Sequence, residues 1–249
     1  MNVKWESQGD GAALLLIQGL GYGRWGWSPV VPGLAERYRV LTFDNRGIGD
    51  SDKPEGPYSA RMMADDALQV LDEAGVERAH VVGASLGGMI AQELAVLAPD
   101  RVDRLVLCCT ALRSDAFPFP EATVTLMAEA PTLAPDVALR RFVENALGAN
   151  PSPALVEEIL AMRIANPPDP AGWQAQAVAG ATFAGVDGTI EAPTLILHGT
   201  EDNVVDVRHA ELLAEHIPGS RVVLVPGTGH LFFWEDPQAF LAPVLEFLA

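Results

Sequence analysis

The stretch that decides the fold reads Val81-Val82-Gly83-Ala84-Ser85-Leu86-Gly87-Gly88. Its apolar start predicts a buried strand and its continuation predicts a helix, so Ser85 falls on a sharp strand-to-helix turn. Such a turn strains the backbone at the serine and crowds the positions two before and two after it, where Gly83 and Gly87 carry no Cβ. The turn would present the Ser85 hydroxyl at a helix N-terminus, which favours developing negative charge. We therefore expect Ser85 to be a nucleophile; the alternative is a glycine-rich turn with a surface serine.

Composition narrows the class of partner. The chain has 249 residues, enough for one large α/β domain, and carries a formal net charge of −17. Nucleic acids and anionic membranes require clustered positive charge, whereas lysine occurs only at Lys4 and Lys53 and the longest basic run is Arg140-Arg141. We expect a small-molecule substrate and neither a nucleic-acid nor a membrane partner. The composition does not decide between a monomer and a homo-oligomer.

The same sequence indicates a cytoplasmic protein that needs no metal or other cofactor. Residues 1–9 lack the basic start and apolar stretch of a signal peptide, and no run of about 18 apolar residues is present. Cys108 and Cys109 are adjacent, so a disulfide between them would be strained and both are expected to be free thiols. The acidic segment 44–52 lacks the terminal glutamate and alternating ligands of a calcium loop, so we favour a hydrogen-bonded structural loop.

Strand and helix patterns alternate along most of the chain, which indicates an α/β fold with a mostly parallel sheet flanked by helices. The first helix pattern spans 60–74, with Ser59 as its expected N-cap. Strand patterns lie at 3–7, 13–17, 38–43, 80–84, 102–108, 193–197 and 221–225, and later helix patterns at 89–98, 206–216 and 237–248.

A glycine-rich loop, Gln18-Gly19-Leu20-Gly21-Tyr22-Gly23, directly follows the strand at 13–17. It lacks the Gly-Lys-Ser/Thr ending of a phosphate loop and the glycine spacing of a dinucleotide fingerprint. A better use is an oxyanion hole, to which the backbone N–H groups of Leu20 and Leu86 would contribute.

The character of the sequence changes between residues 112 and 187. Strand patterns vanish, prolines recur, and the stretches between them have helical periodicity, from which we expect about four helices. We interpret 112–187 as a helical cap inserted into a core domain formed by 1–111 and 188–249. Bulky apolar residues of this cap are candidates for enclosing the substrate: Met127, Phe142 and Trp173.

Two further polar residues follow strand patterns late in the chain, Asp202 and His230. Catalytic groups of open α/β sheets gather at the carboxyl ends of the strands, so both are expected near Ser85. Glu201 and Asp206 are rival acids, and a loop histidine bonded to backbone is the alternative for His230.

Taken together, four motifs resemble the α/β-hydrolase family: Gly83-x-Ser85-x-Gly87, Asp44-x-Arg46-Gly47-x-Gly49, His198-Gly199-x-x-Asp202 and Gly229-His230. The resemblance covers about residues 1–110 and 190–249, and segment 44–59 is similar to carboxylesterase-like hydrolases and 3-oxoadipate enol-lactonases. It implies an α/β-hydrolase fold of seven to eight strands. The family usually has His-Gly where this chain has Gln18-Gly19, and the N-terminus is shorter than usual, which favours seven strands.

The expected roles follow from the chemistry of the three residues. His230 takes the Ser85 proton during attack and returns it to the leaving group, while Asp202 orients the imidazole. Dehalogenases and epoxide hydrolases of the family need an aspartate in place of Ser85, so acyl transfer remains. Our first hypothesis is a serine esterase acting on a small, fairly apolar carboxylic ester; the alternatives are an enol-lactonase and a slow-turnover ligand receptor.

Overall fold

A computed structural model describes all residues, 1–249, and contains one seven-stranded sheet in the order β1-β3-β2-β4-β5-β6-β7. Only the edge pair β1 and β3 is antiparallel, and every other neighbouring pair is parallel. The predicted α/β fold and its seven strands are therefore confirmed. The strands are β1 (Trp5–Gln8), β2 (Ala12–Ile17), β3 (Tyr38–Phe43), β4 (Ala79–Ala84), β5 (Val102–Cys108), β6 (Thr194–Gly199) and β7 (Arg221–Val225).

The central strand β2 is apolar throughout because both faces of the sheet are covered there. In β2, Leu15 and Ile17 pack into the hydrophobic cluster on one face, while Leu14 and Leu16 pack into the cluster on the other. Successive side chains of a strand point to opposite faces, so a run without polar residues requires two buried faces.

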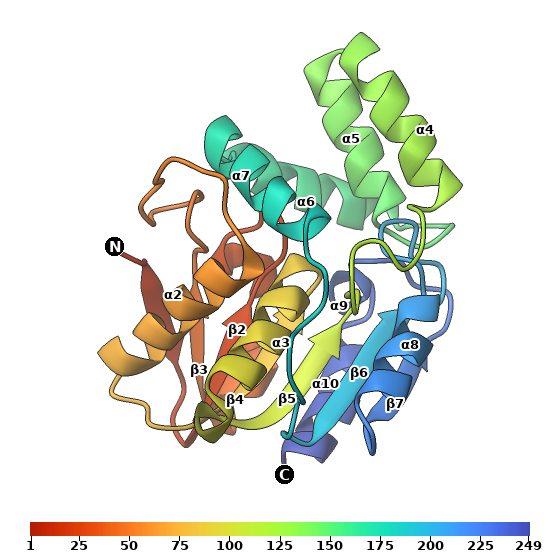
Figure 1. Ribbon diagram of the computed structural model, residues 1–249. Helices are drawn as coiled ribbons and strands as arrows, with labels where there is room; N and C mark the ends of the chain where they lie inside the picture. Colours follow the sequence, from red (N-terminus) through yellow and green to blue (C-terminus); the bar gives the residue numbers. More distant parts are fainter.

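Helices cover the sheet on both sides (Figure 1). On one face lie α2 (Ala60–Glu73), α3 (Leu86–Leu97) and α8 (Arg208–His216), and on the other α1 (Val31–Ala35) and α10 (Pro237–Leu248). As predicted, the Ser59 side chain caps α2 by accepting from Met62 N–H at 3.2 Å.

Between β5 and β6 the chain forms four α-helices, as the sequence predicted, which we call the insertion: α4 (Glu121–Glu129), α5 (Pro135–Asn145), α6 (Pro153–Ala165) and α7 (Pro170–Ala181). Figure 1 shows α6 and α7 above the ends of the strands, with α4 and α5 projecting farther from the sheet. Asp169 caps α7 by accepting from Gly172 N–H at 2.8 Å, whereas Ser152 makes no side-chain cap at α6.

The short elements were not anticipated from the sequence. They are η1 (Arg24–Trp27), α1, η2 (Pro99–Arg101), η3 (Ala130–Thr132) and α9 (Phe232–Glu235). Each has five residues or fewer, too few for a helical period to become visible in the sequence. No helix combines the length and apolar character that crossing a membrane requires.

Candidate active site

Ser85 occupies the turn between β4 and α3, in a strained backbone conformation with φ 56° and ψ −123°. Its N–H donates to Cys108 O at 2.9 Å, so the neighbouring strand β5 fixes the turn. A Cβ on Gly83 would collide with the Gly87 carbonyl oxygen, and one on Gly87 would collide with the Ile17 carbonyl oxygen. Both glycines are therefore needed for the close approach of backbone segments, as the motif predicted.

The glycine-rich loop after β2 lies directly against Ser85. A Cβ built on Gly19 would be 2.9 Å from Ser85 Cβ and 3.5 Å from Ser85 Oγ. The N–H of Leu20 donates to no group of the protein, and the N–H of Leu86 begins α3, where no partner exists within the helix. Neither N–H group is therefore engaged by the protein.

Gln18 accepts two hydrogen bonds at the start of this loop. Its Oε1 accepts from Gly19 N–H at 2.7 Å, and its backbone oxygen accepts from Asn45 Nδ2 at 2.9 Å. The Gln18 side chain therefore bonds the glycine-rich loop, in the position where the family usually has histidine.

Asp202 and His230 form a buried pair. His230 Nδ1 lies 2.8 Å from Asp202 Oδ2, and because a carboxylate only accepts, Nδ1 is the donor, which leaves Nε2 as the acceptor in a neutral imidazole. Asp202 Oδ1 accepts from Val204 N–H and Val205 N–H at 2.7 and 2.9 Å. Burial acts to raise the pKa of Asp202, but His230 and His198 outweigh it and hold the pKa well below its usual value.

The two rival acids bond elsewhere. Glu201 Oε2 accepts from Ala149 N–H at 2.6 Å, and Asp206 pairs with Arg208 at 2.7 Å. Of the three acidic candidates, Asp202 is therefore the one that the structure brings to His230.

A second histidine contacts the same carboxylate, which the sequence analysis did not anticipate. His198 is fully buried, and its Nε2 lies 3.0 Å from both Asp202 Oδ2 and Val205 O. The spacing His198-Gly199-x-x-Asp202 was the available signal, but only the turn after β6 shows that the two side chains meet. With four hydrogen-bonding partners, the Asp202 carboxylate is fixed in one orientation.

Glu235 was also missed by the sequence analysis. Its two carboxylate oxygens accept from Gly229 N–H at 2.7 Å and from Gly148 N–H at 2.9 Å, so it ties the loop that carries His230 to the insertion. Leu231 N–H adds a bond to Ala146 O at 2.9 Å. Burial raises the pKa of Glu235, and the two N–H groups only partly offset that rise.

The three predicted substrate-enclosing residues have different surroundings. Trp173 on α7 is 41% exposed and its ring covers Gly21 of the glycine-rich loop. Met127 on α4 and Phe142 on α5 are 54% and 42% exposed, on the two helices that project farthest from the sheet. Trp173 is therefore brought to the loop beside Ser85, and no described contact brings Met127 or Phe142 there.

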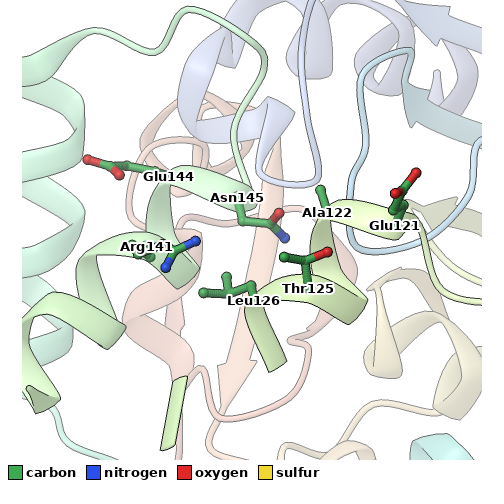
Figure 2. Close-up of a pocket in the computed structure, with 7 residues that line it drawn as sticks. All are labelled: Glu121, Ala122, Thr125, Leu126, Arg141, Glu144 and Asn145. Carbon is green, nitrogen blue, oxygen red and sulfur yellow. The ribbon is translucent and has the colours of Figure 1, made fainter. Parts of the chain in front are cut away.

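A cavity of about 480 Å³ lies between α4 and α5 (Figure 2). Its lining is mostly polar or charged and includes none of the predicted site residues: Glu121, Ala122, Thr125, Leu126, Arg141, Glu144 and Asn145. Such a lining does not fit a pocket for an apolar acyl group. No group of three or more His, Cys, Asp or Glu side chains is arranged to hold a metal ion.

The segment 44–52 is a hydrogen-bonded loop. Asp44 Oδ1 accepts from Arg24 N–H at 2.8 Å, and its Oδ2 accepts from Asp50 N–H at 3.0 Å and pairs with the Arg24 guanidinium. The carboxylate of Asp44 is therefore engaged by backbone and arginine groups.

The parallel sheet with a strained serine between strand and helix defines the class of α/β proteins built on a nucleophile elbow. The chain belongs to the alpha/beta hydrolase fold family, whose model matches residues 12–237, and it is a hydrolase of that family. A relative named "Putative carbamate hydrolase RutD", from Azorhizobium caulinodans, is 35% identical over 98% of this chain and 93% of its own length.

Two solved structures show the same architecture. An esterase from Thermogutta terrifontis is 28% identical with a TM-score of 0.81, covering 99% of this chain and 92% of that one. The enol-lactonase from Burkholderia xenovorans is 27% identical with a TM-score of 0.83, covering 99% of this chain and 96% of that one. All three relatives are named as hydrolases, while the substrate classes in their names are a carbamate, an ester and an enol-lactone.

Proposed function

We propose that the protein is a serine hydrolase that cleaves a small, fairly apolar carboxylic ester through an acyl-enzyme. The observation that carries the proposal is the buried pair of His230 and Asp202. His230 follows β7 and Asp202 follows β6, so both lie at the carboxyl ends of the parallel strands, as does the strained Ser85 after β4. Ser85 is partly exposed, as a residue that receives a substrate must be.

In the first half of the reaction, Ser85 Oγ attacks the ester carbonyl carbon while His230 Nε2 accepts the hydroxyl proton. The carbonyl oxygen becomes an oxyanion, which the N–H groups of Leu20 and Leu86 stabilise. When the tetrahedral intermediate collapses, His230 returns the proton to the departing alcohol and the acyl group stays on Ser85. Asp202 remains ionised and stabilises the imidazolium that forms in between.

The second half repeats these steps with water. Water attacks the acyl carbon, His230 takes one of its protons, and the proton then passes to Ser85 Oγ as the carboxylic acid leaves. The net reaction consumes one ester and one water and yields an acid and an alcohol.

Enol-lactone hydrolysis is the second candidate, favoured by the similarity to the Burkholderia xenovorans enol-lactonase over 99% of this chain. The same steps apply, except that the alcohol produced stays attached to the acyl group after ring opening. The site chemistry is therefore shared, and the enclosure of the substrate decides between the two.

A substrate panel tests this choice. p-Nitrophenyl esters of increasing acyl length, assayed beside an enol-lactone, should give the higher kcat/KM with a short or medium ester. A kcat/KM at least tenfold higher for the enol-lactone would replace the ester assignment by the lactone assignment. Saturable binding of both substrate types with negligible steady-state turnover would instead indicate a receptor.

A further inference from the structure

The insertion binds both polar groups of one peptide residue in the glycine-rich loop beside Ser85. Gly21 N–H donates to Gln176 Oε1 of α7 at 3.0 Å, and Gly21 O accepts from Arg163 Nη1 of α6 at 2.8 Å. Gly21 itself has φ +69°, a conformation that favours glycine. Two helices of the insertion thus fix the residue next to Leu20.

Gln176 is the more completely enclosed of these two side chains. It is fully buried, and its Nε2 donates to Arg46 O at 2.8 Å while its Oε1 receives the Gly21 N–H. One amide therefore joins the loop after β2 to the loop after β3, and both ends of that amide are satisfied. A buried amide in this arrangement has one favourable orientation.

Arg163 lacks a carboxylate partner, although the chain carries 33 acidic residues. The other arginines of the insertion and its entry loop, Arg113, Arg140 and Arg141, each pair with a carboxylate. Arg163 instead bonds the Gly21 carbonyl, and its guanidinium carbon lies 4.7 Å from the centre of the Tyr22 ring. Its contacts are thus directed at the glycine-rich loop.

Because peptide groups are planar, these contacts also restrict the direction of the Leu20 N–H. The peptide plane that contains Gly21 N–H and the plane that contains Leu20 N–H are joined only by the two backbone dihedrals of Leu20. Arg163 holds Gly21 O, which shares a peptide plane with Tyr22 N–H, and that N–H donates at 3.3 Å to Gly19 O, which shares a plane with Leu20 N–H. Together with the Gly21 N–H bond to Gln176, these bonds limit the directions in which Leu20 N–H can point. α7 also passes over the second proposed donor, since a Cβ on Gly180 would be 3.7 Å from Leu86 Cδ1.

We propose that Gln176, assisted by Arg163, is a positioning residue that sets the oxyanion-binding geometry of the glycine-rich loop. The insertion then contributes to the rate of the chemical step as well as to the enclosure of substrate. This inference rests on the proposed function, because it assigns Leu20 N–H to a developing oxyanion.

The test compares Gln176→Met with Gln174→Met, a matched change at an exposed position of the same helix. In Gln176→Met, kcat should fall about 10- to 100-fold for esters of every acyl length while KM stays within about twofold, because a misplaced donor weakens only the transition state. The inhibition constant of a trifluoromethyl ketone, which binds as an oxyanion, should rise by the same factor. Gln174→Met should retain wild-type values.

Arg163 provides a second comparison in case Gln176→Met folds poorly. Arg163→Met should lower kcat with KM unchanged, and Arg163→Lys, which keeps a donor for Gly21 O, should recover most of the loss. Arg140→Met serves as the control for charge. Unchanged kcat in folded Gln176→Met and Arg163→Met, or a change confined to KM, would overturn the inference while Ser85-dependent hydrolysis stands; absence of any ester or lactone hydrolysis by wild type would overturn the proposed function itself.

Discussion

At the scale of single residues, the structure shows which of three neighbouring acids contacts His230. Asp202 bonds His230 and His198 through one oxygen and two backbone N–H groups through the other. Glu201 and Asp206 are one and four positions away along the chain, and neither bonds His230. The sequence favoured Asp202 and kept Glu201 and Asp206 as rivals, because spacing along a loop does not determine which carboxylate turns inward.

Asp202→Asn should lower kcat on the order of 10⁴-fold at neutral pH, because the amide no longer stabilises the imidazolium and favours the wrong tautomer of His230. Glu201→Gln and Asp206→Asn are the matched changes and should cost less than about tenfold. Steady-state kinetics with one p-nitrophenyl ester measures all three. The opposite ranking would transfer the orienting role to the residue with the largest effect.

Several contacts of the candidate site could not be predicted from the sequence, because they join residues that lie far apart along the chain. Gly83 and Gly87 were identified because the elbow motif spans five consecutive residues, although the group that a Cβ on Gly87 would meet, the Ile17 carbonyl oxygen, lies far away along the chain. Gln176 bonds a residue 155 positions away, and Glu235 joins two loops 81 positions apart. A hydrogen bond of this kind leaves no periodic pattern, so only the folded arrangement makes it visible.

At the scale of elements, strands and long helices were predictable and short ones were not. β3, β5 and β7 have the bounds expected from their strand patterns. β3 and β5 are mostly buried, whereas the edge strand β7 exposes Val222 and Leu224. The helix α9 was missed since its apolar residues, Phe232 to Trp234, give no period over four positions. α10 continues through Pro243, which shows that packing against the sheet outweighs the lost hydrogen bond.

Helix α8 carries a histidine that should make stability depend on pH. Burial, and then the nearby His198, lowers the pKa of His209 from 6.5 to about 4. The folded protein therefore keeps His209 neutral while the unfolded chain binds a proton below about pH 6.5. The free energy of unfolding should decline as pH falls from about 6.5 to about 4, by up to about 3 kcal/mol from this residue.

Urea unfolding at several pH values between 6.5 and 4 measures this decline. His209→Gln should flatten it, even if the variant is less stable overall, and His216→Gln, an exposed histidine of the same helix, should decline as wild type does. Below about pH 5 the unfolded chain also begins to protonate the Asp202 carboxyl, whose pKa is lowered in the folded protein, so the slope between about pH 6.5 and 5 separates His209 from Asp202. Equal slopes for wild type and His209→Gln would contradict the prediction.

At the scale of the whole molecule, the sheet and the insertion contribute different residues to the candidate site. The sheet carries Ser85, Asp202 and His230 after three of its strands, and the insertion lies over those strand ends (Figure 1). The sequence predicted the insertion from its prolines and helical periodicity, but not the bonds by which it reaches the glycine-rich loop and the His230 loop. We propose that Trp173 enters into substrate selection, whereas Gln176 and Arg163 act on rate.

Trp173→Ala should shift the preferred acyl length toward longer chains, because removal of the indole that covers Gly21 opens space over the glycine-rich loop, which lies against Ser85. Each methylene accommodated is worth about 1 to 3 kcal/mol in such a pocket. Met127→Ala and Phe142→Ala test the other two predicted lining residues, and Ile164→Ala, at a 68% exposed position of α6, is the control. If every folded variant kept the wild-type profile of p-nitrophenyl esters, the insertion would have no part in acyl selection.

The central claim is that Ser85, activated by His230 and Asp202, forms the acyl-enzyme. Intact-mass spectrometry after reaction with a fluorophosphonate tests it most directly, with Ser28→Ala, an exposed serine, as the matched control. Wild type and Ser28→Ala should each gain one adduct. Ser85→Ala should gain none, keep its fold, and lose kcat on the order of 10⁴- to 10⁶-fold. An adduct on Ser85→Ala, or more than a tenth of wild-type activity in that variant, would contradict the account.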